Sequence, residues 1–186
     1  MSVLVTGGAR SGKSRYAEAL ARHWAGEEVT YIATLEPSDD EMMRRIAQHQ
    51  ARRPEGWSTV EVRLGVARAI LEAATQTVLL DCLSGFVSNL LLKHEDRGEV
   101  AVMRALSEAV EEVIETVRVS QKRVIIVTNE VGSGVVPAYA LGRWYRDALG
   151  TANAQVAGVA NAVVLMSVGL PQVLKGIVPE VAVDAP

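Results

Sequence analysis

Eight consecutive residues near the amino terminus have the types and spacing of a loop that binds the phosphates of a nucleoside triphosphate. They fit the pattern G-x-x-x-x-G-K-[ST] and read Gly7, Gly8, Ala9, Arg10, Ser11, Gly12, Lys13 and Ser14. In such a loop the glycines let backbone N–H groups approach phosphate oxygens, the lysine neutralises charge, and the last hydroxyl binds Mg²⁺. The sequence therefore predicts a triphosphate site in which Lys13 is catalytic and Ser14 is a metal ligand.

A carboxylate that supports the metal is expected at the end of another buried strand. The run Val78-Leu79-Leu80-Asp81 has this form, and we interpret Asp81 as the second metal-binding residue. The alternative is a turn or a helix cap, because aspartate is a common residue at both. A further expected strand ends in Thr128, Asn129 and Glu130, which should lie at the same edge of the sheet. The tasks of Thr128, Asn129 and Glu130 stay open.

A single histidine, His49, lies among arginines in the segment Ser38–Arg53. The segment opens with a helix-capping signature and ends before a proline, so we expect a helix here. On that helix the histidine has cationic neighbours three or four positions away, namely Arg45, Arg52 and Arg53. One interpretation is a histidine on an apolar face with solvated arginines. The other is a nucleophile that faces phosphate, because a neutral imidazole can attack phosphorus while arginines meet phosphate charge.

Short aliphatic runs alternate with longer amphipathic segments along the chain, as in a parallel sheet covered by helices. The expected strands span residues 2–6, 29–33, 58–62, 78–82, 123–128 and 162–168, with a short last strand over 172–175. Helices are expected over 14–24 and 99–121. The first strand and helix flank the phosphate loop, as a triphosphate site requires. We predict an α/β protein with a single-domain P-loop NTPase fold of the RecA-like type, its mainly parallel sheet covered by helices on both faces.

Composition restricts the class of protein. The 186 residues are 49% hydrophobic and carry a formal net charge of −3, which predicts one domain and argues against a nucleic-acid partner. The single cysteine, Cys82, excludes an intramolecular disulfide and is typical of a reducing compartment. No apolar stretch is long enough to span a membrane and no signal sequence is evident, so we expect a cytoplasmic protein. We expect a nucleotide-binding and catalytic domain over 1–175 and a weakly patterned tail over 176–186.

Several further segments, together with the phosphate loop, form a recognisable series. They are 5–15, 31–34, 40–42, 45–46, His49, 53–54, Trp57, 128–132, Gly134, 136–137, Arg143, 146–147, Gly150 and Asn153. Their order and spacing, from about Val3 to Lys175, resemble the family of bifunctional adenosylcobinamide kinases and adenosylcobinamide-phosphate guanylyltransferases of cobalamin biosynthesis. A phosphate loop alone would not distinguish this family from other nucleotide-binding proteins.

The resemblance implies two successive reactions. A nucleoside triphosphate, ATP or GTP, phosphorylates the aminopropanol hydroxyl of adenosylcobinamide, and GTP then donates GMP to adenosylcobinamide-phosphate to give adenosylcobinamide-GDP. It also implies that His49 carries the GMP covalently, that Mg²⁺ takes part and that the enzyme is a homotrimer. The nucleotide-binding positions that it implies beyond the phosphate loop are Ala33, Thr34, Leu35, Gln50, Ala51, Arg52, Arg53, Glu61 and Asp81. By the residues alone, Glu61 would be an exposed strand carboxylate.

Some positions and functions stay open. Ala154 and Asn161 depart from residues common in the family, which leaves details of the late helix and the substrate edge undecided. Trp144 and Tyr145 could face the corrinoid or a neighbouring subunit, although aromatic residues at helical spacing more often belong to a core or an interface. Two other functions are compatible with the residues: another P-loop small-molecule kinase with a structural His49, and a nucleotide-gated interaction module without covalent chemistry.

Overall fold

The computed structural model describes residues 1–35, 43–44, 47, 50–51 and 53–182. Within these residues, seven strands form one sheet in the order β3-β2-β4-β5-β1-β6-β7. The strands are β1 (Ser2–Gly7), β2 (Val29–Ala33), β3 (Ser58–Glu61), β4 (Thr77–Asp81), β5 (Arg123–Asn129), β6 (Ala162–Ser167) and β7 (Leu170–Lys175). Neighbouring strands are parallel except β6 and β7, which form an antiparallel hairpin.

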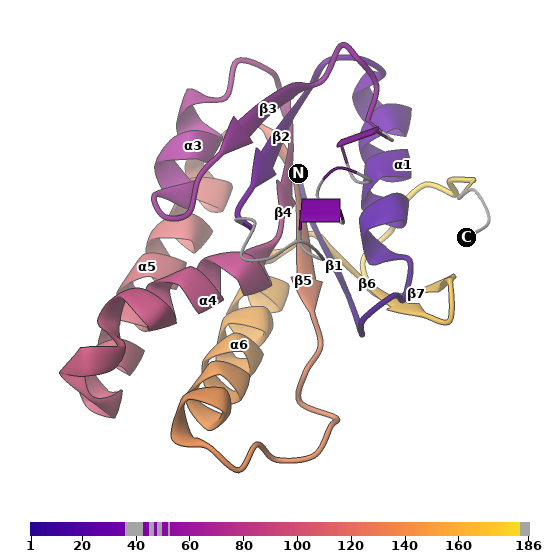
Figure 1. Cartoon of the computed structure of the whole chain (residues 1–186). Coiled ribbons are helices and arrows are strands. Elements are labelled where there is room, and N and C mark those ends of the chain that lie inside the picture. Colours follow the sequence, from indigo (N-terminus) through magenta and orange to yellow (C-terminus); the bar gives the residue numbers. More distant parts are fainter. Residues whose placement is uncertain (36–42, 45–46, 48–49, 52, 183–186) are drawn as a thin grey trace.

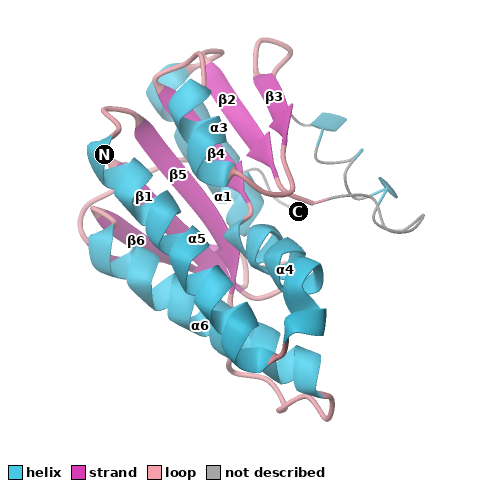
Figure 2. Cartoon of the chain, turned by 90° about the vertical axis from the view of Figure 1, so that its left-hand side faces the viewer, coloured by secondary structure: helices cyan, strands magenta, loops and turns pink. Residues whose placement is uncertain are grey.

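Helices cover both faces of the sheet (Figures 1 and 2). The helix α1 (Lys13–Ala25) packs on one face. The helices on the other face are α3 (Val66–Glu72), α4 (Leu83–His94), α5 (Glu99–Val119) and α6 (Ala140–Val159), and a short 3₁₀ helix, η1 (Glu95–Arg97), joins α4 to α5. Because side chains alternate along a strand, Val3 and Val5 of β1 pack with α1 while Leu4 packs with the opposite helices. The predicted α/β class with helices on both faces is confirmed.

The predicted strands and the helices predicted over 14–24 and 99–121 are confirmed, with ends that differ by at most two residues. The helix predicted over 38–53 falls largely outside the described residues. The largest difference at a strand is in β7, which begins at Leu170. It begins early because Val168 and Gly169 form a two-residue turn with φ of 47° and 84°, so pairing with β6 resumes at once. The helix α5 ends at Val119 because Ser120 has an extended backbone.

The strand register brings the carboxyl ends of several strands to one edge of the sheet. Ala33 is paired with Glu61 on one side and with Asp81 on the other, and Gly7 is paired with Asn129. Because parallel strands end at the same edge, loops from distant parts of the sequence meet there. This edge is where the candidate site lies.

Among the described residues, no helix is both long and apolar enough to cross a membrane.

The predicted tail has contacts with the core. Val178 and Val181 are partly buried against the core on the α1 side. This part of the tail therefore contacts the main body of the protein.

Candidate active site

The phosphate loop joins the end of β1 to the start of α1. Gly12 has a left-handed backbone with φ of 90°, a conformation that glycine adopts without strain. Its carbonyl accepts from the Tyr16 N–H over 3.0 Å, and the Gly8 carbonyl accepts from the Ser11 N–H over 3.3 Å. The loop therefore leads directly into a helix N-terminus, where unpaired N–H groups attract phosphate.

Gly7 lies in a space that admits no side chain. A Cβ atom at this position would lie 2.5 Å from the carbonyl oxygen of Met166 in β6 and 2.6 Å from the Ser11 Oγ. At Gly8, by contrast, a Cβ atom would meet nothing within 4 Å. The Ser11 hydroxyl is buried and has no hydrogen-bond partner among the described residues. The loop thus keeps a polar group that a phosphate oxygen could bind.

Lys13 and Asp81 come together at the carboxyl edge of the sheet. The Lys13 ammonium donates to the Gly8 carbonyl over 3.1 Å. Burial lowers the pKa of Lys13, and the nearby negative charge of Asp81 acts in the opposite direction. The residue predicted to neutralise phosphate charge is therefore close enough to the residue predicted to support the metal for their charges to interact.

The donor groups at this place suit a magnesium nucleotide. Mg²⁺ prefers oxygen ligands and keeps several waters, so one or two protein oxygens beside the phosphates are enough. Ser14, in the first turn of α1, and Asp81, at the end of β4, offer a hydroxyl and a carboxylate. Within the described part of the chain, no group of three or more His, Cys, Asp or Glu residues could hold a metal ion. The residues present fit a metal that arrives with its nucleotide.

Thr34 fastens the turn after β2 to the start of α4. Its hydroxyl donates to the Cys82 carbonyl over 2.7 Å and accepts from the Cys82 N–H over 3.0 Å. Asn89 of α4 donates to the Thr34 carbonyl over 2.8 Å. Gly85 leaves room for this contact, because a Cβ atom there would lie 2.6 Å from the Thr34 hydroxyl. The turn over residues 33–35, which holds three of the implied nucleotide-binding positions, is therefore held close to the end of β4.

The side chain of Tyr31 connects Asp81 with Arg53. The Tyr31 hydroxyl donates to Oδ2 of Asp81 over 2.8 Å. The guanidinium carbon of Arg53 lies 3.4 Å from the centroid of the Tyr31 ring, and its Nη1 donates to the Thr59 hydroxyl over 3.2 Å. Arg53 follows the predicted nucleophile in the sequence, and the structure brings it to the same edge as Asp81.

The other predicted nucleotide contacts lie near this edge or beyond the described residues. Glu61 is exposed at the end of the outer strand β3 and is paired with Ala33. Gln50 and Ala51 are exposed helical residues. The predictions for His49, Arg45 and Arg52 fall outside the described residues.

A chain of polar contacts behind the strand ends was missed by sequence reasoning. The Asn129 side-chain amide donates to the Ser84 hydroxyl over 3.0 Å, and the Asn129 carbonyl accepts from the Asn153 amide over 2.9 Å. The Thr128 hydroxyl donates to Oδ1 of Asn153 over 2.7 Å. The position of Asn129 at the end of a strand indicates a place at the site, whereas Ser84 belongs to no motif that would indicate one. These contacts join β5 to α4 and α6 beside the phosphate loop.

The loop between β5 and α6 is also fastened beside the phosphate loop. The Glu130 N–H donates to the Gly7 carbonyl over 3.1 Å. Arg143 and Arg146 of α6 donate to carbonyl oxygens of the loop over 2.7 to 3.1 Å. Both arginines therefore order the loop that follows β5.

The positions left open in the late part of the chain have structural contacts. Oδ1 of Asn161 accepts from the Ser2 N–H over 2.7 Å at the start of β1, the opposite end from the phosphate loop, so this departure does not touch the site. Trp144 and Tyr145 are partly buried against the core. Burial raises the pKa of Tyr145 to about 12, and its hydroxyl donates to the Ser84 carbonyl over 3.4 Å.

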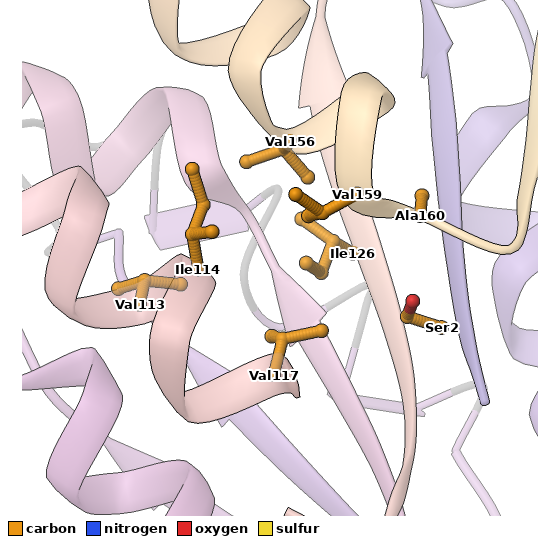
Figure 3. Close-up of a pocket in the computed structure, with 8 residues that line it drawn as sticks. All are labelled: Ser2, Val113, Ile114, Val117, Ile126, Val156, Val159 and Ala160. Carbon is orange, nitrogen blue, oxygen red and sulfur yellow. The ribbon is translucent and has the colours of Figure 1, made fainter. Parts of the chain in front are cut away.

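An apolar pocket between α5 and α6 is separate from the site (Figure 3). It is lined by Ser2, Val113, Ile114, Val117, Ile126, Val156, Val159 and Ala160. Ser2 begins β1, whereas the phosphate loop follows the other end of that strand. The lining has no charged side chain, so the pocket does not suit a phosphate ligand.

The phosphate loop between β1 and α1, with an aspartate at the end of a nearby parallel strand, defines an α/β enzyme of the P-loop nucleotide-binding class. A solved ATPase from the type III secretion system of pathogenic bacteria shares the fold with a TM-score of 0.58. It is 11% identical, and the match covers 92% of this chain and 56% of that chain, so it shows the fold alone.

Comparison with known proteins identifies the family. The family model for cobinamide kinase / cobinamide phosphate guanyltransferase matches residues 3–174. The bifunctional adenosylcobalamin biosynthesis protein CobU of Escherichia coli is 41% identical over 179 residues, which cover 91% of this chain and 97% of the relative. Its counterpart CobP of Pseudomonas aeruginosa is 42% identical over 178 residues, which cover 95% and 98%. The chain belongs to the cobinamide kinase / cobinamide phosphate guanyltransferase family, as predicted, and is a bifunctional enzyme that uses nucleotide substrates.

Proposed function

We propose that one nucleotide site serves both activities of this enzyme. In the first reaction a nucleoside triphosphate phosphorylates adenosylcobinamide, and in the second GTP donates GMP through His49 to adenosylcobinamide-phosphate. The observation that carries this proposal is the convergence of Lys13, Asp81 and Arg53 at one edge of the sheet. Groups suited to the γ-phosphate and to the α-phosphate thus come from one continuous site.

In the kinase reaction, Lys13 and the backbone N–H groups of residues 7–14 bind the phosphates. The aminopropanol hydroxyl attacks the γ-phosphorus, and the nucleoside diphosphate leaves. Ser14 and Asp81 would hold Mg²⁺, which neutralises charge on the β- and γ-phosphates. ATP and GTP can both serve, because these contacts are made to phosphates.

In the guanylyl transfer, a neutral imidazole nitrogen of His49 attacks the α-phosphorus and pyrophosphate leaves. The phosphate of adenosylcobinamide-phosphate then attacks the phosphorus bound to His49, which frees the histidine and gives adenosylcobinamide-GDP. Arg52 and Arg53 would stabilise the charge that develops on the α-phosphate. The position of Arg53 over the Tyr31 ring, at 3.4 Å, supports this role because it brings the Arg53 guanidinium to the phosphate edge.

The nucleoside is assigned to the strand ends beside the phosphate loop. Glu61 and Ala33 lie in register at the ends of β3 and β2, and Thr34 is held by Cys82. We assign the turn over residues 33–35 and the Glu61 carboxylate to the ribose or base. Gln50 and Ala51, next to the predicted nucleophile, complete the set of nucleotide contacts.

GTP labelled at a single phosphorus tests the histidine mechanism. With Mg²⁺ and α-labelled GTP, the protein should acquire a bound label that is acid-labile and alkali-stable, and His49→Ala should abolish it. His23→Ala, a change at an exposed histidine of α1, is the matched control and should keep the label. Absence of α-label from the wild-type protein would contradict this mechanism and favour a kinase with a structural His49. Transfer of γ-label to adenosylcobinamide measures the kinase reaction separately.

We also propose a cytoplasmic homotrimer that acts without nucleic acid. The net charge of −3 supports the absence of a nucleic-acid partner. The single, buried Cys82 supports a reducing compartment such as the cytoplasm. Burial raises the pKa of Cys82 to about 11, so the thiol is neutral at pH 7 and is a weak nucleophile. We assign residues 1–175 to the catalytic domain and 176–186 to a tail.

A further inference from the structure

Tyr31 touches two residues of the proposed site and has no part in the mechanism described so far. We propose that Tyr31 is a positioning residue that orients the Asp81 carboxylate through its hydroxyl and the Arg53 guanidinium through its ring. The inference rests on the proposed function, in which Asp81 supports the metal-nucleotide and Arg53 meets the α-phosphate. One side chain would then align the groups for both transfers.

The sheet dictates where the Tyr31 side chain points. Tyr31 belongs to the core on the α1 side and is paired with Leu79 of β4. Side chains two positions apart on a strand share a face, so Asp81 lies on the same face as Leu79. From β2 the tyrosine therefore reaches diagonally to the end of β4, within reach of a long side chain.

The hydroxyl of Tyr31 restrains the Asp81 carboxylate. Tyr31 is only 2% exposed, so water cannot readily replace its bond of 2.8 Å to Oδ2. A phenol hydroxyl keeps its proton near neutral pH and an ionised carboxylate can only accept, so Tyr31 is the donor in this contact. A hydrogen bond to an ionised acceptor is among the stronger ones in proteins.

The ring of Tyr31 restrains Arg53 in a different way. The guanidinium lies over the ring at 3.4 Å, and Thr59, the residue paired with Tyr31 on β3, accepts its Nη1 hydrogen bond. The Nε atom of Arg53 is buried and has no hydrogen-bond partner among the described residues. A planar guanidinium can stack on a ring in this way, whereas a lysine ammonium cannot. The position of Arg53 is therefore tied to the same side chain that restrains Asp81.

Two substitutions separate the two contacts of Tyr31. Tyr31→Phe removes the hydroxyl and keeps the ring, while Tyr31→Leu removes both. Mn²⁺ with α,β-methylene GTP, which cannot release pyrophosphate, allows metal-nucleotide binding to be measured by electron paramagnetic resonance without turnover. We expect Tyr31→Phe to weaken binding of this complex about tenfold. Binding of the same nucleotide in EDTA should be unchanged, because the hydroxyl acts through the metal-supporting carboxylate.

The contact with Arg53 is measured by the rate of α-labelling from GTP. Tyr31→Leu should label about tenfold more slowly than Tyr31→Phe, because the guanidinium loses the ring beneath it. If Tyr31→Leu fails to fold, Tyr31→Met, which also removes the ring and leaves Arg53 unchanged, tests the same contact and should also slow labelling. Tyr16→Phe removes a hydroxyl from another tyrosine of the same core and is the matched control. Thermal unfolding without nucleotide reports whether each variant is folded.

Asp81→Asn distinguishes failure of this inference from failure of the proposed function. Asp81→Asn should weaken Mn²⁺-nucleotide binding, and adding Tyr31→Phe should cause no further loss, because both act through one carboxylate. If Asp81→Asn weakens binding while Tyr31→Phe binds as the wild type does, the role of Tyr31 is overturned and that of Asp81 stands. Equal losses for Tyr31→Phe with Mn²⁺ and in EDTA would indicate packing alone and also overturn it. Wild-type metal binding by Asp81→Asn would overturn both.

Discussion

The charge of Lys13 favours nucleotide binding and disfavours the folded protein that has no nucleotide. Burial lowers the pKa of Lys13 despite the opposing charge of Asp81, so the ammonium is less stable here than in water. A bound triphosphate would supply more negative charge beside Lys13 than Asp81 supplies alone. Residues that serve a ligand in this way are expected to stabilise the complex more than the free protein.

Lys13→Met should therefore separate binding from stability. We expect nucleotide affinity and γ-phosphoryl transfer to fall by about 100-fold or more, because a charge-assisted phosphate contact is lost. The midpoint of thermal unfolding at pH 7 without nucleotide should stay the same or rise. Titration calorimetry and scanning calorimetry measure the two effects, with Lys93→Met at an exposed lysine of α4 as the control. Full activity of Lys13→Met would contradict the assignment of the phosphate loop.

Residues of the site could be predicted where a short motif defines them. Lys13 and Ser14 follow from local spacing, and Asp81 follows from its place at the end of a buried strand. Tyr31 could not be found this way, because its contact with Asp81 joins positions 50 residues apart and a tyrosine in a strand is expected in the core. The contact between Ser84 and Asn129 spans 45 residues and depends equally on strand order.

At the scale of elements, the close approach of β6 to the phosphate loop constrains the end of β1. Gly7→Ala would place a Cβ atom 2.5 Å from the Met166 backbone oxygen, so the strands would have to move apart. We expect the free energy of unfolding to fall by about 1–3 kcal/mol, as for other overpacked positions. Urea unfolding without nucleotide measures this, and Gly8→Ala is the control because its Cβ meets nothing within 4 Å. Equal stability of the two variants would show that the strands separate readily.

The elements themselves were predictable because each carries its own periodicity, and their order in the sheet was not. β4 lies beside β2 and β5 lies beside β1, and both of these neighbours are distant in sequence. No local pattern encodes this pairing. The start of β7 was placed too late for a different reason. Val168 has φ of 47°, which a β-branched residue rarely adopts, so the sequence gives no clear sign of the tight turn.

At the scale of the whole molecule, the two outer strands of the sheet differ. β3 is four residues long and carries mostly polar side chains, whereas β7 is six residues long, exposed along its whole length and largely apolar. Leu170 and Leu174 of β7 are 68% and 57% exposed, and the nearby Val168 and Ile177 are 88% and 87% exposed. An exposed apolar outer strand offers both surface and backbone groups to another chain. If the protein is the proposed homotrimer, we expect a contact between its copies at this edge.

Lysine at two positions of β7 tests this contact. Leu170→Lys combined with Leu174→Lys should convert the proposed trimer to monomers in sedimentation velocity, because buried charges of one sign oppose association. Val100→Lys, at a residue of α5 that is 75% exposed, is the control and should keep the trimer. Because Lys13, Asp81 and Arg53 belong to one chain, the monomer should still bind α,β-methylene GTP. A trimeric double variant would rule out this edge as the interface, and a monomeric wild-type protein would contradict the homotrimer itself.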